Sequence, residues 1–277
     1  MKKTNAFVFC VLSLLVLSLA AGVKAYNDTY THTIYNSEVT PTIDGTYTTN
    51  DDWLASGTEY FGDNGIFRDE WTMTPNVLAC LLIETTDNTT DAGDKWVICY
   101  DGTEAGAATE PDGGPAPTEF DYKLEVTGHD PSQTIEWFRG DGSGWTLITP
   151  TPNTTIANIS EALTTTGLIL DDHYVLELAI DKTNTDLGST IMGYNWAQFV
   201  SYYDENTTTT QQWPPADADP AGDPDVPDSW GYIVYDMEAN PTPNVPEGIG
   251  IIAMISLSSV AAAGALALRK RKIAKLN

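Results

Sequence analysis

The stretch from Asn76 to Gly102 constrains the fold more than any other part of the chain. An apolar run, Val77–Ile83, is followed by a polar stretch and then by a second β-rich run, Lys95–Tyr100. Successive side chains of a strand point to opposite sides, so the first run is apolar on both faces. Such a strand belongs in the middle of a packed sheet. The two runs together predict a β-hairpin with a long polar loop.

The rest of the chain predicts short strands separated by turn residues, and no run before residue 249 has a sustained helical period. Gly102–Pro117 and Thr207–Ser229 are expected to be loops, and Ile135–Leu147 a hairpin. The pattern indicates an all-β fold, a two-layer antiparallel β-sandwich. The other strand candidates are Thr31–Tyr35 as an edge strand, Trp71–Met73, Phe120–Thr127, His173–Ile180, Met192–Ser201 and Trp230–Asp236.

The two ends of the chain predict a protein that is exported and stays attached to a membrane. Lys2 and Lys3 precede an apolar segment, which is the form of an N-terminal signal peptide. A long uncharged stretch near the other end fits one C-terminal transmembrane helix, and a buried core helix is the alternative. Basic residues follow it, so the C-terminus is expected inside and the ectodomain on the extracellular face of the cell membrane. The expected parts are a signal peptide (1–25), a β-sandwich ectodomain (26–237), a spacer (238–248), a transmembrane helix (249–268) and a basic cytoplasmic tail (269–277).

The charge of the segment between these ends is strongly negative. It holds all 39 acidic residues of the chain but few of the 13 basic ones, namely Arg68, Lys95, Lys123, Arg139 and Lys182. This field excludes nucleic acids and anionic lipid surfaces as partners. A solvated acidic surface is one interpretation. The other is a Ca²⁺ site, for which the candidate ligands are Asp217, Asp219, Asp223 and Asp225.

Two sequence features depend on the extracellular location. Removal of the signal peptide leaves Cys80 and Cys99, which would face each other in a symmetric hairpin and form a disulfide; two buried free thiols are the alternative. Asn-x-Ser/Thr triplets suggest glycosylation. They begin at Asn27, Asn88, Asn153, Asn158 and Asn206.

Four motifs occur in an order that resembles one known family. They are Ile43-Asp44-Gly45 followed by Asp52-Trp53, then Asp94–Gly102, Phe120-Asp121-Tyr122 and Tyr174–Ile180. From about Thr42 to Tyr235 the chain is similar to family 9 carbohydrate-binding modules, which are DOMON-like sandwich domains. The resemblance implies a non-catalytic module that binds a polysaccharide or a cell-surface glycan.

The same resemblance implies candidate sugar-binding residues. In sugar-binding members of the family, two tryptophans enclose a terminal sugar and polar groups bind its hydroxyls. Trp213, a short way after Asp204, matches the second of these tryptophans. The first position falls on Asp91-Ala92-Gly93, which has no aromatic residue, and Val97 stands where the family has Glu. Trp96, Trp137 or Trp145 would supply the missing wall, and core or hairpin packing is the alternative for each.

The C-terminus resembles bacterial and archaeal sorting tails. Pro246-Glu247, an apolar span and the run Arg269–Lys272 follow one another as in those tails. The resemblance implies cleavage and transfer to another anchor by a sortase-like membrane protease. A plain stop-transfer helix is the alternative.

Two further functions compete with glycan binding. One is a structural or adhesive surface glycoprotein that binds no small ligand. The other is a haem-binding redox domain, since related sandwiches hold haem b between Met and Lys or His. The residues that would supply its ligands are Met73, Met192, Met237, His129, His173 and Lys123. An enzyme is the least favoured interpretation, because the three histidines belong to no nucleophile–base or metal-binding motif.

Overall fold

The computed structural model describes residues 26–37, 40–47, 53, 57–62, 65–72, 78–101, 111, 113–149, 157–166, 169–181 and 196–239. Within these ranges the chain forms thirteen β-strands and one 3-10 helix, Pro227–Ser229. The strands are β1 (Asn27–Ser37), β2 (Gly57–Phe61), β3 (Gly65–Thr72), β4 (Leu78–Glu84), β5 (Lys95–Asp101), β6 (Asp121–Thr127), β7 (Thr134–Gly140), β8 (Trp145–Leu147), β9 (Ala157–Thr164), β10 (His173–Asp181), β11 (Trp196–Asp204), β12 (Thr209–Trp213) and β13 (Gly231–Ala239).

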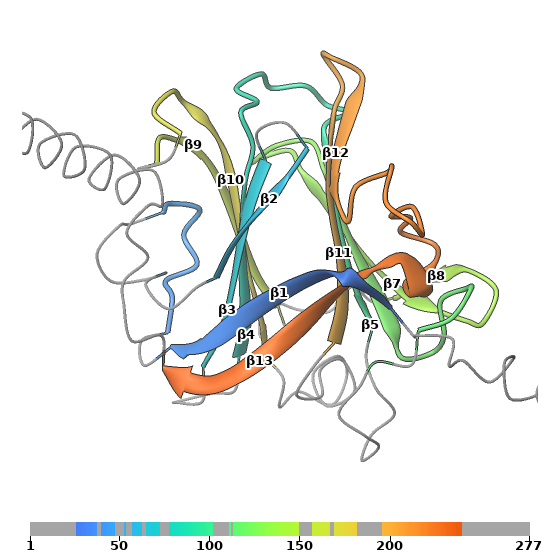
Figure 1. Ribbon diagram of the computed structural model, residues 1–277. Helices are drawn as coiled ribbons and strands as arrows, with labels where there is room; N and C mark the ends of the chain where they lie inside the picture. Colours follow the sequence, from blue (N-terminus) through green and yellow to red (C-terminus); the bar gives the residue numbers. More distant parts are fainter. Residues whose placement is uncertain are drawn as a thin grey trace, which may run out of the picture. The chain divides into compact units, whose positions relative to one another are not determined.

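The strands belong to one sheet that curls back on itself. Their order is β8-β7-β6-β5-β11-β13-β1-β3-β4-β10-β9, with β12 paired to β11 and β2 paired to β3. Figure 1 shows β5, β7, β8, β11 and β12 on one side, and β2, β3, β4, β9 and β10 on the other. We call the first set, with β6, the β5 half and the second set the β4 half. The predicted all-β class is confirmed.

The join between the two halves differs from the prediction. β1 and β13 run side by side across the front of the view in Figure 1 and pair with each other in parallel, and β1 also pairs in parallel with β3. The sequence predicted two layers of purely antiparallel strands, with Thr31–Tyr35 at an edge. β1 instead lies between β13 and β3, so the two layers are parts of one continuous sheet.

The predicted hairpin between residues 77 and 100 is wrong, although both of its strands exist. β4 pairs with β3 and β10, whereas β5 pairs with β6 and β11. Both strands are therefore central, which the two apolar faces of the first run predicted for β4, but the strands lie in opposite halves. A polar connection of this length can cross the roughly 10 Å between two packed layers as easily as it can close a hairpin.

The main core lies between the two halves and contains the inward-pointing side chain of every second residue. Phe67 of the β4 half meets Trp213 of the β5 half edge to face, with ring centroids 5.1 Å apart. Trp96 and Trp137 of the β5 half belong to the same cluster as Leu176 and Leu178 of the β4 half. This shared core holds the two halves together, because burying large apolar side chains is the main source of stability.

Several strands were not predicted, for a common reason. β12 carries mostly polar side chains, half of the β9 residues are polar, and β2 contains few apolar residues, so none shows a clear apolar alternation. The β7–β8 hairpin is confirmed by its pairing. β13 extends to Ala239, two residues into the predicted spacer.

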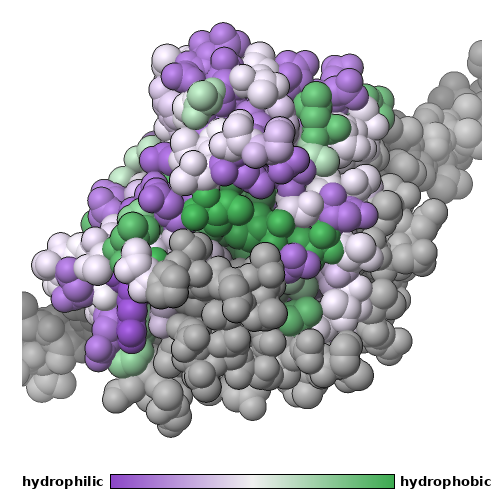
Figure 2. Space-filling view, turned by 180° about the vertical axis from the view of Figure 1, so that it is seen from behind, coloured by the Kyte–Doolittle hydropathy of each residue, from purple (hydrophilic) through white to green (hydrophobic). Residues whose placement is uncertain are grey.

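Large hydrophobic side chains that are exposed in the described ranges are Tyr60, Leu147, Leu163 and Leu170. Figure 2, seen from behind, shows hydrophobic residues gathered near the centre of that face with hydrophilic residues around them. Exposure of a few single side chains, such as Tyr60 and Leu170, is ordinary for a globular fold.

The chain divides into two compact units, residues 1–239 and 240–277. The predicted signal peptide (1–25), transmembrane helix (249–268) and basic tail (269–277) all lie outside the described residues. Among the residues that are described, no helix has the length and hydrophobicity needed to cross a membrane.

Candidate functional site

Residues 40–47 and Trp53 cover part of the outer face of the β4 half, and Glu177 holds them in place. The Glu177 carboxylate, on β10, accepts the backbone N–H groups of Asp44 and Gly45, each at 2.8 Å, and the Trp53 indole N–H at 2.9 Å. Trp53 is 3% exposed and packs on Cys80 and other outward-pointing residues of this half. The Ile43-Asp44-Gly45 and Trp53 motif therefore covers one face of the sheet.

The outer face of the β5 half is covered at one end by the loop 214–229. The Trp230 indole N–H donates to the Asp223 carbonyl at 2.8 Å, and Cys99 Sγ lies 3.7 Å from the Pro224 carbonyl oxygen. A small apolar cluster lies on this face, and the loop packs on its Cys99 and Trp230; its members are Val97, Cys99, Ala197, Phe199 and Trp230. The loop leaves the other end of this face open.

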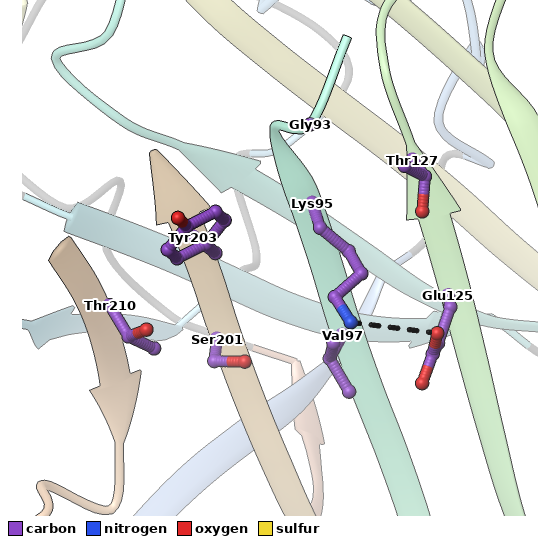
Figure 3. A pocket seen from close by; sticks show the side chains of 8 residues that line it. All are labelled: Gly93, Lys95, Val97, Glu125, Thr127, Ser201, Tyr203 and Thr210. Atoms are coloured by element: carbon purple, nitrogen blue, oxygen red, sulfur yellow. Dashed lines mark ion pairs between the residues drawn. The ribbon is translucent and has the colours of Figure 1, made fainter. Parts of the chain in front are cut away.

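The open end is a groove of about 520 Å³ that crosses four neighbouring strands. Figure 3 shows its side chains on β6, β5, β11 and β12, all on the same side of the sheet. They share a face because residues two apart on a strand point the same way, as Ser201 and Tyr203 do on β11. The full set is Gly93, Lys95, Val97, Glu125, Thr127, Ser201, Tyr203 and Thr210.

The groove combines an aromatic ring, hydroxyl groups and a charged pair. The Tyr203 side chain is half-buried, and Ser201, Thr127 and Thr210 add hydroxyls that can both donate and accept hydrogen bonds. Lys95 Nζ lies 3.7 Å from Glu125 Oε2, the contact drawn as a dashed line in Figure 3. A surface with these groups fits a ligand that has many hydroxyls and an apolar C–H face.

A buried ionic network begins at Asp94, next to Gly93 of the groove. His129 Nε2 lies 2.9 Å from Asp94 Oδ2, and His129 Nδ1 lies 3.2 Å from Glu161 Oε1. Carboxylates only accept hydrogen bonds, so both ring nitrogens donate and His129 is an imidazolium ion. Asp94 adjoins β5, whereas Glu161 is on β9. The network therefore ties the two halves together at this end of the groove.

This network predicts a pH dependence of stability. Burial alone would lower the pKa of His129, but hydrogen bonds to Glu161 and Asp94 and their negative charges raise it above its ordinary 6.5. The stabilisation is therefore complete below pH 6.5 and is lost as the pH rises through the folded-state pKa. We expect wild-type protein to lose more unfolding free energy than His129→Gln between about pH 6 and pH 9. Urea titrations across this range measure the difference, and parallel curves for the two proteins would contradict the assignment.

The aspartates proposed as calcium ligands do not come together. All four are exposed: Asp217, Asp219, Asp223 and Asp225. In the described ranges, the acidic and histidine residues whose possible ligand atoms lie close together are instead Asp87, Asp94 and His129. Asp223 Oδ1 accepts the N–H of Asp225 at 2.8 Å. The calcium prediction is corrected: these loop carboxylates spread over the loop surface, and Asp223 shapes its backbone.

The Asp87, Asp94 and His129 group already has protein partners. The Tyr202 hydroxyl donates to Asp87 Oδ2, and Asp94 Oδ1 accepts the N–H of Glu205 at 2.8 Å. With both His129 nitrogens also bonded, the polar atoms of the group are satisfied within the fold.

Three of the predicted sugar-binding tryptophans are core residues. Trp213, Trp96 and Trp137 are 2%, 0% and 1% exposed, and all belong to the cluster between the halves. A sugar ring needs an open aromatic face, so the clamp prediction is wrong at these positions. For Trp96 and Trp137 the core alternative is confirmed, whereas no core role was predicted for Trp213. Trp213 points inward because it lies on the β12 face opposite to Thr210 of the groove.

The other two predicted binding residues also have structural roles. Trp145 is half-buried, stacks parallel to Trp230 with centroids 6.3 Å apart, and donates its indole N–H to Asp225 at 2.8 Å. Asp204 closes the turn between β11 and β12 by accepting the N–H of Thr207 at 3.0 Å. Neither lines the groove.

The predicted disulfide is wrong, and the alternative of two buried free thiols is confirmed. Cys80 and Cys99 belong to separate clusters on the outer faces of opposite halves. They cannot meet because β4 and β5 are not neighbours in the sheet.

The glycosylation candidates divide by exposure. Asn88, Asn158 and Asn206 are exposed, whereas Asn153 lies outside the described residues. Asn27 is 4% exposed and donates from its side-chain amide to the Pro220 carbonyl at 3.2 Å. The prediction at Asn27 is corrected, because a buried, bonded amide is not accessible to a glycan.

The residues considered for haem have other partners. His129 bonds through both nitrogens, and His173 Nδ1 lies 2.8 Å from the Asp171 carbonyl oxygen. Lys123 Nζ lies 2.9 Å from Glu125 Oε1. Met73, Met192 and the side chain of Met237 lie outside the described part of the chain.

Sequence reasoning did not find the groove residues Tyr203, Ser201, Thr127 and Thr210. One signal was present, because the outward positions of β11 change from Phe199 to Ser201 and Tyr203 along the strand. A change from apolar to polar side chains on one face marks where a covering loop ends.

No family model matches the chain, and no curated protein sequence matches it. Among solved structures it is similar to a candidate carbohydrate-binding protein from Bacteroides uniformis. The TM-score is 0.44 and the sequence identity 10%, over 75% of this chain and 99% of that one.

Proposed function

We propose that the chain is a non-catalytic glycan-binding protein of the cell surface and that the groove on β6, β5, β11 and β12 is its binding site. The observation that carries the proposal is the composition of that groove. An aromatic ring, several hydroxyls and a charged pair occupy one open face of the sheet. The strongly acidic charge of the chain disfavours nucleic acids as ligands of the same surface.

Each part of the groove has a role in this proposal. The Tyr203 ring packs on the C–H face of a sugar, and the neighbouring hydroxyls bind the sugar hydroxyls. Val97 and Ser201 are nearly buried and form the floor. Because the floor is a rigid sheet, the binding groups are held in position before the ligand arrives.

The non-catalytic role is supported by the position of the histidines. His32, His129 and His173 are buried and do not line the groove. Placement at the outer face of the membrane follows from the predicted signal peptide and transmembrane helix, and the predicted sorting-type tail belongs to the same proposal.

A glycan array probed with the purified full chain tests the proposal. We expect binding to at least one class of glycan, reduced about tenfold or more by Tyr203→Ala, since loss of an aromatic platform costs roughly 1–3 kcal/mol. Tyr60→Ala is the matched control, because Tyr60 is a 65% exposed tyrosine outside the groove. If Tyr203→Ala left glycan binding unchanged, the binding site would lie outside the groove. If no glycan on the array were bound, the alternative of a structural or adhesive surface glycoprotein would be favoured.

A further inference from the structure

Two lysines share a single carboxylate on the groove face. Glu125 Oε1 lies 2.9 Å from Lys123 Nζ, whereas its other oxygen, Oε2, lies 3.7 Å from Lys95 Nζ. The first distance is that of a charge-assisted hydrogen bond, and the second is too long for any hydrogen bond. Lys123 therefore neutralises Glu125, and the charge of Lys95 is only loosely compensated.

Lys95 is also the more accessible of the two lysines. Its side chain is 38% exposed, against 12% for Lys123. Lys123 Nζ lies 4.8 Å from the ring centroid of Phe138, which further fixes its position. The Lys95 ammonium group is therefore the one able to take a new partner without exposing a buried charge.

Lys95 and Glu125 are the charged side chains among the described residues that line the groove. The neighbours of Lys95 across the strands are Thr127 on β6 and Tyr203 on β11. A further carboxylate near the rim, that of Glu205, accepts the N–H of Gly93 at 2.8 Å. A loosely paired cation among hydroxyls and one aromatic ring matches a sugar that carries a negative group.

We propose that the groove selects acidic glycans and that Lys95 binds the carboxylate of a uronic acid residue. This inference rests on the proposed function and names its ligand class. The ligand carboxylate would approach within hydrogen-bond distance of Lys95 Nζ, while Glu125 stays paired with Lys123. Tyr203 and the hydroxyls would bind the sugar ring itself.

The negative charge of the whole chain opposes such a ligand at long range but not at contact. At physiological ionic strength the screening length is about 8 Å, so most of the distant carboxylates are screened. Binding should therefore be measured near 0.15 M salt.

Oligosaccharides of galacturonate, glucuronate and mannuronate, each paired with its methyl ester, test the inference on the purified full chain. The ester keeps the sugar and removes its charge. We expect at least one acid form to bind about tenfold more tightly than its ester. Lys95→Gln should abolish the preference and Lys95→Arg should keep it. Arg139→Gln, which removes the same charge from an exposed residue outside the groove, should leave it unchanged.

The outcomes separate this inference from the proposed function. If neutral glycans and esters bind as well as acids, and Tyr203→Ala still weakens them, the groove is the site but its acidic selectivity is refuted. A preference for acids that survives Lys95→Gln also refutes the role of Lys95. If no uronate oligosaccharide binds, the inference is wrong whatever the neutral glycans do.

Discussion

Replacement of Glu177 by alanine is expected to lower the free energy of unfolding by about 3 kcal/mol. The carboxylate is the acceptor for two backbone N–H groups, of Asp44 and Gly45, and for the indole of Trp53. Without it these donors are left without their acceptor beneath the covering segment. Chemical denaturation measures the change, and Glu119→Ala, which alters an exposed carboxylate, should change stability by no more than about 0.5 kcal/mol.

The titration of Glu177 gives a second test of the same role. Burial raises its pKa from 4.5 to about 7, despite the hydrogen bonds that favour the charged form. The folded state therefore holds a proton that the unfolded state releases, and stability falls as the pH rises from 4.5 to 7. Glu177→Gln does not titrate, so its stability should fall less over this range. A loss below 1 kcal/mol for Glu177→Ala at pH 7 would contradict the proposed anchoring role.

Replacement of Trp213 by alanine is expected to cost about 3–5 kcal/mol, because it opens a large cavity between the two halves. The indole contacts Phe67 of the opposite half, and it lies so close to Gly231 that an added Cβ there would be 2.2 Å from its ring. Trp213→Phe should cost less, since it keeps an aromatic ring and removes a buried indole N–H that has no hydrogen-bond partner among the described residues.

Trp145→Ala is the control, because Trp145 is only half-buried and should cost clearly less. Thermal and urea unfolding of the three variants give the comparison. If Trp213→Ala left stability unchanged and abolished glycan binding, Trp213 would be a ligand contact, and the assignment of the groove to the opposite face of β12 would be wrong.

The fold class could be predicted because its signals are local. The apolar run Val77–Ile83 and the alternation of Phe120–Thr127 each predict a strand and indicate which of its faces are buried. Which strands become neighbours is a different question. The loop between β4 and β5 crosses from one half to the other, and nothing in its polar residues distinguishes that path from a hairpin. The predicted disulfide failed with the hairpin, because it depended on the same pairing.

The candidate site could not be predicted because it depends on what covers each face. Cys99 and Val97 are both outward-pointing residues of β5, yet loop 214–229 packs over Cys99 whereas Val97 reaches the groove. Tryptophans were predicted as binding residues because aromatic rings often pack on sugars. In this fold, however, most of the tryptophans are buried. The polar residues Ser201 and Tyr203 matter because the covering loop ends before it reaches them.

Photo-crosslinking locates a bound glycan on the surface of the protein. A diazirine derivative of the best-binding glycan is irradiated with the full chain, and the labelled peptides are mapped by mass spectrometry. A site in the groove predicts labels within residues 93–97, 125–127 and 201–210, lost on competition with the unmodified glycan. Specific labels confined to loop 214–229 or to the β4 half would contradict the placement of the binding site.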